Sequence, residues 1–417
     1  MKRYPKYKDS GISWLGQIPE HWEMKKINEL FVERREKCSD KEFQPLSVSK
    51  QGITLQLDSA VKTDNGDNRK KVLIGDFVVN SRSDRKGSCG VSKLDGSVSL
   101  INIVLQIRNS LLPQYVHYLM RSNSYIEEFY RWGRGIVADL WTTRFCDMKN
   151  INLPIPPHAE QQKIVEFLDN KISKIDSYIS EMEKEVKLLA ELKQSQIAQV
   201  VTKGINPNVP MKECQTLLTD VYPAHWDYVR NKACLSLTGE KVGDRASDYT
   251  LLSLTTRGVI ERDVESGKGK FPKDFDSYQI VKSNDLVFCL FDIDETPRTV
   301  GLVKKEGMLT GAYTAFCVNA NIALPEYLYY YFLSVDEIKA LKPYYSGLRK
   351  TVRADKFLQI YIPLPPLEEQ KAIVEYINTR CQSIDSMIST LESEIAYLKE
   401  YKQSLIADAV TGAINVQ

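Results

Sequence analysis

The sequence holds few of the residues and motifs on which enzymes commonly depend. Its four histidines are His21, His117, His158 and His225, and its eight cysteines include no C-x-x-C pair. Scattered cysteines of this kind predict buried free thiols rather than a zinc site or a disulfide framework. The chain also has no G-x-x-x-x-G-K-[ST] nucleotide loop, no Gly-rich cofactor turn and no Asn-Pro-Pro-aromatic motif of an amino-methyltransferase. We therefore expect a binding protein without catalytic residues and without a metal.

Long apolar runs are absent as well. No stretch of about 18 apolar residues occurs, and the N-terminal MKRYPKYKDSG lacks the apolar core of a signal peptide. We expect a cytoplasmic protein that does not enter a membrane.

The strongest positive feature is an internal repeat. A segment that starts INLPIPPHAEQQKIVEFLDNK at Ile151 aligns without a gap with one that starts IYIPLPPLEEQKAIVEYINTR at Ile360, and about half of the positions are identical. A weaker match pairs PEHW, which ends at Trp22, with PAHW, which ends at Trp226. We expect structural roles for the two repeated histidines. The repeat predicts a tandem duplication with pseudo-two-fold symmetry.

Each strong repeat predicts a proline-rich stop followed by a long helix. LPIPP (Leu153 to Pro157) cannot lie inside a helix, because proline lacks the amide N–H. Beyond it, apolar residues recur at alternating spacings of four and three, which is a heptad seam. At about 40 residues and 1.5 Å per residue, each helix is about 60 Å long. The seams are Leu168, Ile172, Ile175, Ile179, Met182, Val186 and Leu189, and Ile377, Cys381, Ile384, Ile388, Leu391, Ile395 and Leu398.

Two matched seams in one chain favour pairing of the helices with each other over separate packing on a core. The short stretch after the first helix, with Gly204, Pro207 and Pro210, leads directly into a second globular segment. If the ends of that segment are close together, the second helix runs back along the first. We therefore predict an antiparallel coiled-coil pair.

The remaining segments predict two α+β domains with mixed or antiparallel sheets. Runs such as VLIGDFVVN from Val72 and DLVFCLF from Asp285 predict strands, and LPQYVHYLM from Leu112 and LPEYLYYYFL from Leu324 predict helices. The predicted division is a first globular domain at 1–155, the first long helix and a linker at 156–209, a second globular domain at 210–362 and the second long helix at 363–417.

Three motifs resemble those of one known family. YKDSGISWLGQIPEHW, from Tyr7, is similar to the N-terminal signature of the specificity subunits of Type I restriction-modification systems. LPIPPHAEQQKIVEFLD and IPLPPLEEQKAIVEYIN are similar to the helix starts of that family. The resemblance covers nearly the whole chain, including its two-fold repeat. The second copy departs from the N-terminal signature, because it reads MKECQTLLTDVYPAHW from Met211.

The resemblance implies two target recognition domains, each reading half of a split site in double-stranded DNA. It implies that the long helices set the spacing of the half-sites and dock two methyltransferase subunits, which restriction and translocation subunits then join. S-adenosylmethionine, ATP and Mg²⁺ would belong to those partners and not to this chain. First-turn acidic residues also favour a helix N-terminus without any partner. The expected partner-subunit interface comprises Pro156, Pro157, Glu160, Gln161, Pro365, Pro366, Glu369 and Gln370.

Basic residues on turns are the candidate DNA contacts. Phosphates attract positive charge, and the major-groove edge of guanine suits a bidentate arginine. For any single residue, a solvated surface charge is the alternative. The candidates are Arg82, Arg85, Lys86, Arg131 and Arg134 in the first domain, and Lys268, Lys270, Arg298, Arg349, Lys350 and Arg353 in the second.

The charge of the two predicted domains is unequal. Residues 1–150 hold 25 Lys/Arg against 18 Asp/Glu, whereas residues 210–359 hold 20 of each. A basic domain permits a polyanionic partner. We therefore expect an asymmetric split site, with the first domain relying more on phosphate charge.

Other functions are open at this point. A specificity module of another modification or phage-defence complex would show the same features, and the neighbouring genes would separate the two. An autonomous enzyme would need a catalytic constellation that the sequence does not show. A purely structural coiled-coil adaptor does not explain two large divergent domains on duplicated helices.

Overall fold

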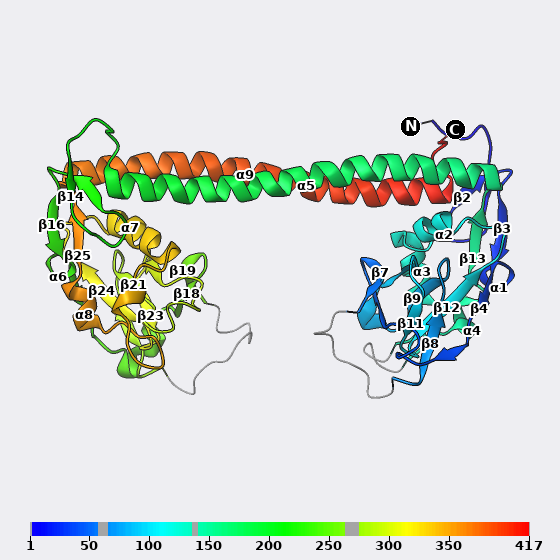
Figure 1. Cartoon of the computed structure of the whole chain (residues 1–417), viewed down its shortest axis with the longest axis horizontal. Coiled ribbons are helices and arrows are strands. Elements are labelled where there is room, and N and C mark those ends of the chain that lie inside the picture. Colours follow the sequence, from blue (N-terminus) through cyan, green and yellow to red (C-terminus); the bar gives the residue numbers. More distant parts are fainter. Residues whose placement is uncertain (1, 57–65, 136–140, 263–274, 417) are drawn as a thin grey trace. The chain divides into compact units, whose positions relative to one another are not determined.

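The computed structural model describes residues 2–56, 66–135, 141–262 and 275–416, which fall into two compact units (Figure 1). Unit 1 comprises Met1–Glu183 and Glu392–Gln417, and unit 2 comprises Lys184–Leu391. Each unit contains an α+β domain and parts of both long helices. The predicted α+β class with two globular domains and long helices is confirmed.

Unit 1 consists mainly of short strands. Its helices are α1 (Ile27–Leu30), α2 (Pro113–Leu119), α3 (Asn123–Arg131), α4 (Phe145–Met148) and the first part of α5 (His158–Lys203). Its strands are β1 (Tyr7–Asp9), β2 (Gln17–Pro19), β3 (Glu23–Lys26), β4 (Phe31–Glu33), β5 (Lys37–Cys38), β6 (Leu46–Ser49), β7 (Gly52–Leu55), β8 (Arg69–Val72), β9 (Phe77–Asn80), β10 (Cys89–Val91), β11 (Gly96–Val98), β12 (Asn102–Ile107) and β13 (Asn152–Ile155).

Unit 2 repeats most of this order, but its described residues include no strand that matches β5 and no α-helix that matches α3. Its helices are α6 (Asn231–Cys234), α7 (Pro325–Glu337), α8 (Ala354–Gln359) and the first part of α9 (Leu367–Thr411). Its strands are β14 (Met211–Glu213), β15 (Val221–Pro223), β16 (Asp227–Arg230), β17 (Leu235–Leu237), β18 (Leu252–Thr255), β19 (Gly258–Glu261), β20 (Gln279–Val281), β21 (Leu286–Phe288), β22 (Val300–Leu302), β23 (Gly307–Leu309), β24 (Thr314–Val318) and β25 (Tyr361–Leu364).

The two units share one sheet topology. The largest sheet has the order β10-β9-β12-β4 in unit 1 and β17-β24-β21-β22 in unit 2, which is the same arrangement written from opposite edges. Other matching pairs are β13 with β3 and β25 with β16, and the hairpins β6-β7 and β18-β19. The pairs between these strands are antiparallel. Single parallel bridges, Pro45 with Ser97 and Leu251 with Met308, also recur.

The long helices begin where the proline motifs predict. Helix α5 starts at His158 and α9 at Leu367, each directly after a Pro-Pro pair. The predicted seam residues are mostly buried or half-buried, whereas the positions between them are mostly exposed. No helix in the described part of the chain is long and apolar enough to cross a membrane.

Ion pairs show the direction in which the helices pack. Within unit 1, Lys402 contacts Asp176 at 2.6 Å and Lys399 contacts Glu183 at 3.0 Å. Positions rise along α5 as they fall along α9, so the pairing is antiparallel, as predicted. Within unit 2, Lys193 contacts Asp385 at 2.6 Å. Figure 1 shows α5 and α9 side by side.

The repeated tryptophans close the ends of the long helices. Helix α5 ends before Gly204 (φ +73°), which lies against Trp226, and α9 ends before Gly412 (φ +79°), which lies against Trp22. A left-handed glycine is a common helix terminator, and here a side chain would also meet Pro19 and Trp22 at Gly412 and Glu369 at Gly204. Both tryptophans are buried. The PEHW and PAHW motifs therefore serve the packing of the helix ends.

Candidate nucleic-acid interface

Two basic segments of unit 1, about 50 residues apart in sequence, meet at one surface. Arg82 forms an antiparallel bridge with Thr142, and Thr142 forms a second one with Arg134. The amide of Ser83 donates to the carbonyl of Trp141 at 3.0 Å. The loop after β9 and the loop after α3 are thus joined by backbone pairing. The predicted clusters around Arg82 and Arg134 form one site, which we call the unit 1 basic surface.

The side chains of the unit 1 basic surface are largely exposed. The side chain of Arg134 is 85% exposed although it pairs with Asp147 at 3.1 Å, and Arg131 pairs with Glu128 at 2.8 Å. Arg82 is exposed, and Arg85 lies 3.6 Å from its neighbour Asp84. The carboxylates of Asp147 and Glu128 are buried, so these pairs hold the two arginines in place while most of each guanidinium side chain still faces water. The exposed guanidinium groups make this surface a candidate site for a polyanion.

Tyr130 fixes the loop that carries Arg82. Its hydroxyl donates to the carbonyls of Arg82 (2.7 Å) and Ser83 (3.2 Å), and its ring lies 5.0 Å from the ammonium of Lys86. Burial, aided by nearby acidic groups, raises the pKa of Tyr130 to about 12, so the hydroxyl keeps its proton at neutral pH. Tyr130 thus ties the backbone of this loop to α3.

Unit 2 places its basic residues on two adjoining loops. Ser346 pairs with Thr351, which makes residues 347–350 the tip of a small hairpin, and Arg349 and Lys350 lie on that tip. The carbonyl of Arg349 accepts from the amide of Asp292 at 2.9 Å, which ties this tip to the loop that carries Arg298. Arg353 stands at the start of α8 and pairs with Asp355 at 2.7 Å. The candidates Lys268 and Lys270 lie outside the described residues.

The loops of the two units correspond. The amide of Thr143 donates to the carbonyl of Ser81 at 3.0 Å, and the amide of Val352 donates to that of Leu290 at 2.8 Å. In both units the residue that follows is an arginine before a short helix, Arg144 before α4 and Arg353 before α8. The same structural position thus carries basic residues in both units, although the loop sequences differ.

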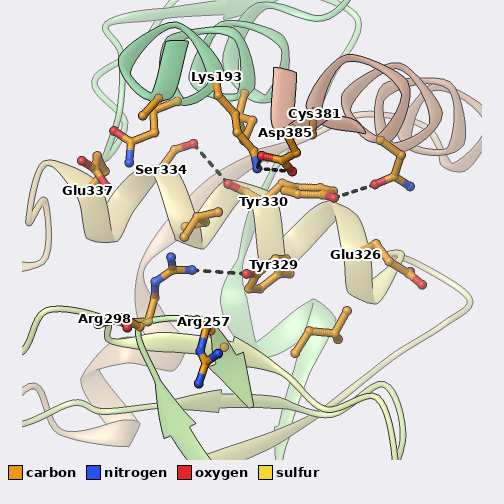
Figure 2. Close-up of a pocket in the computed structure, with 18 of the residues that line it drawn as sticks. Lys193, Arg257, Arg298, Glu326, Tyr329, Tyr330, Ser334, Glu337, Cys381 and Asp385 are labelled. Atoms are coloured by element: carbon orange, nitrogen blue, oxygen red, sulfur yellow. Dashed lines mark hydrogen bonds and ion pairs between the residues drawn. The ribbon is translucent and has the colours of Figure 1, made fainter. Parts of the chain in front are cut away.

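A groove of about 1540 Å³ lies within unit 2 between the long helices, α7 and the hairpin β18-β19. Figure 2 shows Arg257 and Arg298 on the side opposite the helices, where Arg298 donates to the hydroxyl of Tyr329 at 3.2 Å. On the helix side, Lys193 is paired with Asp385. The sequence did not single out Arg257, because a lone arginine in a hairpin turn has no distinguishing pattern. The structure adds it to the basic residues of unit 2.

The polar residues shared by the two proline motifs are used inside each unit. The side chain of Gln161 accepts from the amide of Leu112 (2.9 Å) and donates to the carbonyls of Ser110 and Pro156. Gln370 makes the same three contacts, with the amide of Leu324 (2.7 Å) and the carbonyls of Ile322 and Pro365. Both glutamines are buried. They attach each long helix to the helix of its own domain.

The acidic residues of these motifs pair with the repeated histidines. Nε2 of His21 lies 2.8 Å from Glu160, and Nε2 of His225 lies 2.7 Å from Glu369. The hydroxyl of Tyr4 also donates to Glu160, which is buried. Of the residues expected at the partner interface, Pro157 and Pro366 are exposed, and Pro156 and Pro365 are buried. Their contact with a partner stays a prediction.

The sequence also matches a known family of proteins. Residues 19–188 and 266–396 match the family described as Type I restriction modification DNA specificity domain. The chain belongs to this family. Its first match ends within α5 and its second within α9, so the match follows the duplication. The predicted family resemblance is confirmed.

A relative from this family and two solved structures align with nearly the full chain. The MjaX specificity subunit of Methanocaldococcus jannaschii is 22% identical, over 97% of this chain and 96% of the relative. A solved chain from a study of complex assembly and conformational transition of the type I R-M system has a TM-score of 0.70 at 15% identity, covering 94% of this chain and 98% of its own. The HsdS subunit from Thermoanaerobacter tengcongensis has a TM-score of 0.50 at 16% identity, with 95% and 98% covered. The solved structures show that the fold is shared.

The specificity family is defined by DNA recognition, and the unit 1 basic surface and the unit 2 loops are its candidate sites in this chain. No group of three or more His, Cys, Asp or Glu side chains among the described residues is placed to hold a metal ion. The assignment of individual basic residues to DNA contacts stays a prediction. In each unit, backbone pairing brings the loops that carry most of these candidates together.

Proposed function

We propose that this specificity subunit is itself non-catalytic and that each of its units reads one half of a split, asymmetric DNA site. The observation that carries the proposal is the repeated topology with divergent loops: the two units place loops of different sequence at the same structural position. Base readout requires such side-chain differences, whereas phosphate contacts position the protein. Two different surfaces are suited to two different half-sites.

The net positive charge of residues 1–150 supports an unequal division of labour. Exposed arginines of the unit 1 basic surface are suited to phosphate contacts, each of which makes binding more dependent on salt. Residues 210–359, by contrast, hold equal numbers of basic and acidic residues. Unit 1 would thus depend more on phosphate contacts for its affinity, and unit 2 would depend more on contacts that carry no charge.

The long helices carry two matching exposed apolar patches, which support docking of two copies of one partner. The first patch, within unit 1, comprises Tyr178, Tyr397 and Tyr401, and the second, within unit 2, comprises Met387, Leu188 and Leu192. Each residue of one patch has its repeat counterpart, 209 positions away, in the other. In the first patch the rings of Tyr397 and Tyr401 are stacked at 6.5 Å. Exposed aromatic residues of this kind are typical of protein interfaces.

We assign these patches to two methyltransferase subunits, and restriction and translocation subunits then join that core. S-adenosylmethionine, ATP and Mg²⁺ belong to those partners in this proposal. Replacing Tyr397 and Tyr401 with serine should remove one of the two methyltransferase subunits, because each tyrosine contributes about 2 kcal/mol to such an interface. Native mass spectrometry of the reconstituted complex measures the stoichiometry, and Glu400→Ser, an exposed neighbour, is the matched control. A complex that keeps both methyltransferase subunits would remove the first patch from the proposal.

Reconstitution tests the non-catalytic role. This chain, the methyltransferase subunit of its host's Type I system, and both together are mixed with labelled S-adenosylmethionine and unmodified genomic DNA. We expect methyl transfer only when both proteins are present. Transfer by this chain alone, or by the methyltransferase alone at the same sequences, would contradict the proposal.

A further inference from the structure

A turn in unit 2 presents one apolar side chain without any cover. Leu348 has an exposed fraction of 104%, which means that its side chain is as open to water as in an extended peptide. It follows Gly347 (φ +77°) and precedes the exposed Arg349. Single exposed apolar residues are common on protein surfaces and by themselves indicate no function. Leu348 differs from such residues because its turn is fixed by backbone hydrogen bonds and carries an exposed arginine.

The turn that carries Leu348 is fixed at its base. Ser346 and Thr351 exchange both backbone hydrogen bonds, at 3.0 and 3.1 Å, and the amide of Lys350 donates to the carbonyl of Gly347 at 3.1 Å. The hairpin is further tied to the neighbouring loop, because Arg349 accepts from Asp292 and the amide of Val352 donates to Leu290. An apolar side chain on a braced turn loses little conformational freedom when it binds.

The charges around the turn favour a nucleic acid as the partner. Lys350 pairs with Asp294 at 3.2 Å and with the exposed Glu295 at 3.5 Å, and Lys342 pairs with Asp294 at 3.3 Å. These charges balance one another, and among the described residues Arg349 is the charge that remains at the tip. Arg349 is exposed and follows Leu348 directly, and Arg353 stands at the start of α8, two residues beyond the hairpin. The corresponding position in unit 1 is the basic surface around Arg82 and Arg134. Leu348 thus stands next to an exposed arginine, on the loop that corresponds to the unit 1 basic surface.

We propose, on the basis of the DNA-recognition function proposed above, that Leu348 is a wedge that inserts between two stacked base pairs of the half-site read by unit 2. Proteins that deform DNA place leucine and similar apolar side chains between base steps in this way. Arg349 then holds the adjacent phosphates. Insertion removes the leucine side chain from water, which favours binding. Because some base steps unstack more easily than others, Leu348 would contribute to sequence specificity without a hydrogen bond to any base.

The test uses the complete modification complex and a duplex that carries the site it methylates. Each base pair contains one purine, so 2-aminopurine can replace one purine at a time through both half-sites and report unstacking by its fluorescence. With the wild-type complex we expect fluorescence to rise at one step of a single half-site. Leu348→Ala should abolish that rise and weaken binding about tenfold, because the variant buries much less apolar side chain. Leu348→Met should retain the signal.

Controls separate the wedge from other roles of the residue. Leu237→Ala removes another exposed leucine of unit 2 and should leave affinity and fluorescence unchanged. The dependence of affinity on salt should be the same for Leu348→Ala and the wild type, since no charge is removed. Weaker binding without unstacking in the wild type would show a groove contact and overturn the wedge. Equal DNA affinities of Leu348→Ala and Leu237→Ala would overturn any DNA role for Leu348. A wild-type complex that does not bind the duplex carrying its target sequence would overturn the proposed function itself.

Discussion

At the scale of single residues, Gln161 and Gln370 of the proline motifs make their hydrogen bonds within this chain. The family resemblance predicts both residues at a partner interface. Each buried amide satisfies one backbone N–H and two carbonyls that the start of a long helix and the preceding helix would otherwise leave unpaired. A buried backbone group without a partner costs about 1 to 3 kcal/mol. These glutamines hold helix and domain together within each unit.

Gln161→Ala should therefore lower the free energy of unfolding by about 2 to 4 kcal/mol, since it removes three hydrogen bonds at a buried position. Denaturant unfolding followed by circular dichroism measures the change. The matched control is Gln162→Ala on the next position of α5, an exposed side chain that donates to Glu166 at 3.2 Å, and its effect should be small. Equal effects of the two substitutions would mean that the buried contacts do not stabilise the fold.

At the scale of elements, the loop after β9 is the best defined part of the unit 1 basic surface. Replacing Arg82, Arg85 and Lys86 with alanine should weaken binding to one half-site, and the slope of log affinity against log salt should fall by about 0.9 for each phosphate that the variant no longer neutralises. Fluorescence anisotropy at several salt concentrations measures both quantities. The other half-site serves as an internal control, because its base preferences should stay as they are. Unchanged affinity and an unchanged salt slope would remove this loop from the interface.

The sequence predicted elements whose signal is local. The starts of α5, α9, α2 and α7 follow prolines, and the heptad seams became the buried sides of the long helices. The run VLIGDFVVN was less simple, because β8 ends at Val72, β9 begins at Phe77, and Gly75 (φ +91°) turns the chain between them. Local patterns do not report such a turn when apolar residues flank it.

Contacts between distant segments were beyond the sequence. Nothing in the local pattern predicts that Thr142 bridges both Arg82 and Arg134, because that pairing depends on how the domain folds as a whole. Strand order and the groove beside Arg257 have the same origin. For the proline motifs the local signal was clear but did not distinguish contacts within the chain from contacts with a partner.

At the scale of the whole molecule, α5 is a continuous helix of 46 residues that passes from unit 1 into unit 2, and α9, with 45, passes from unit 2 into unit 1. If these helices set the distance between the half-sites, removing one heptad from each shortens the pair by about 10 Å, or about 3 base pairs. The gap in the recognised site should contract by that amount or binding should fail. Methylation mapping measures the gap, and an unchanged gap in a shortened but folded protein would exclude rigid spacing.

Methylation mapping of the host genome, with and without this gene, tests the central claim most directly. The account predicts that one two-part, asymmetric motif, with a fixed gap between its halves, is methylated when the gene is present and loses all methylation when the gene is deleted. A contiguous or palindromic motif, or methylation that persists after deletion, would contradict the claim that two different units of this chain each read half of a split site.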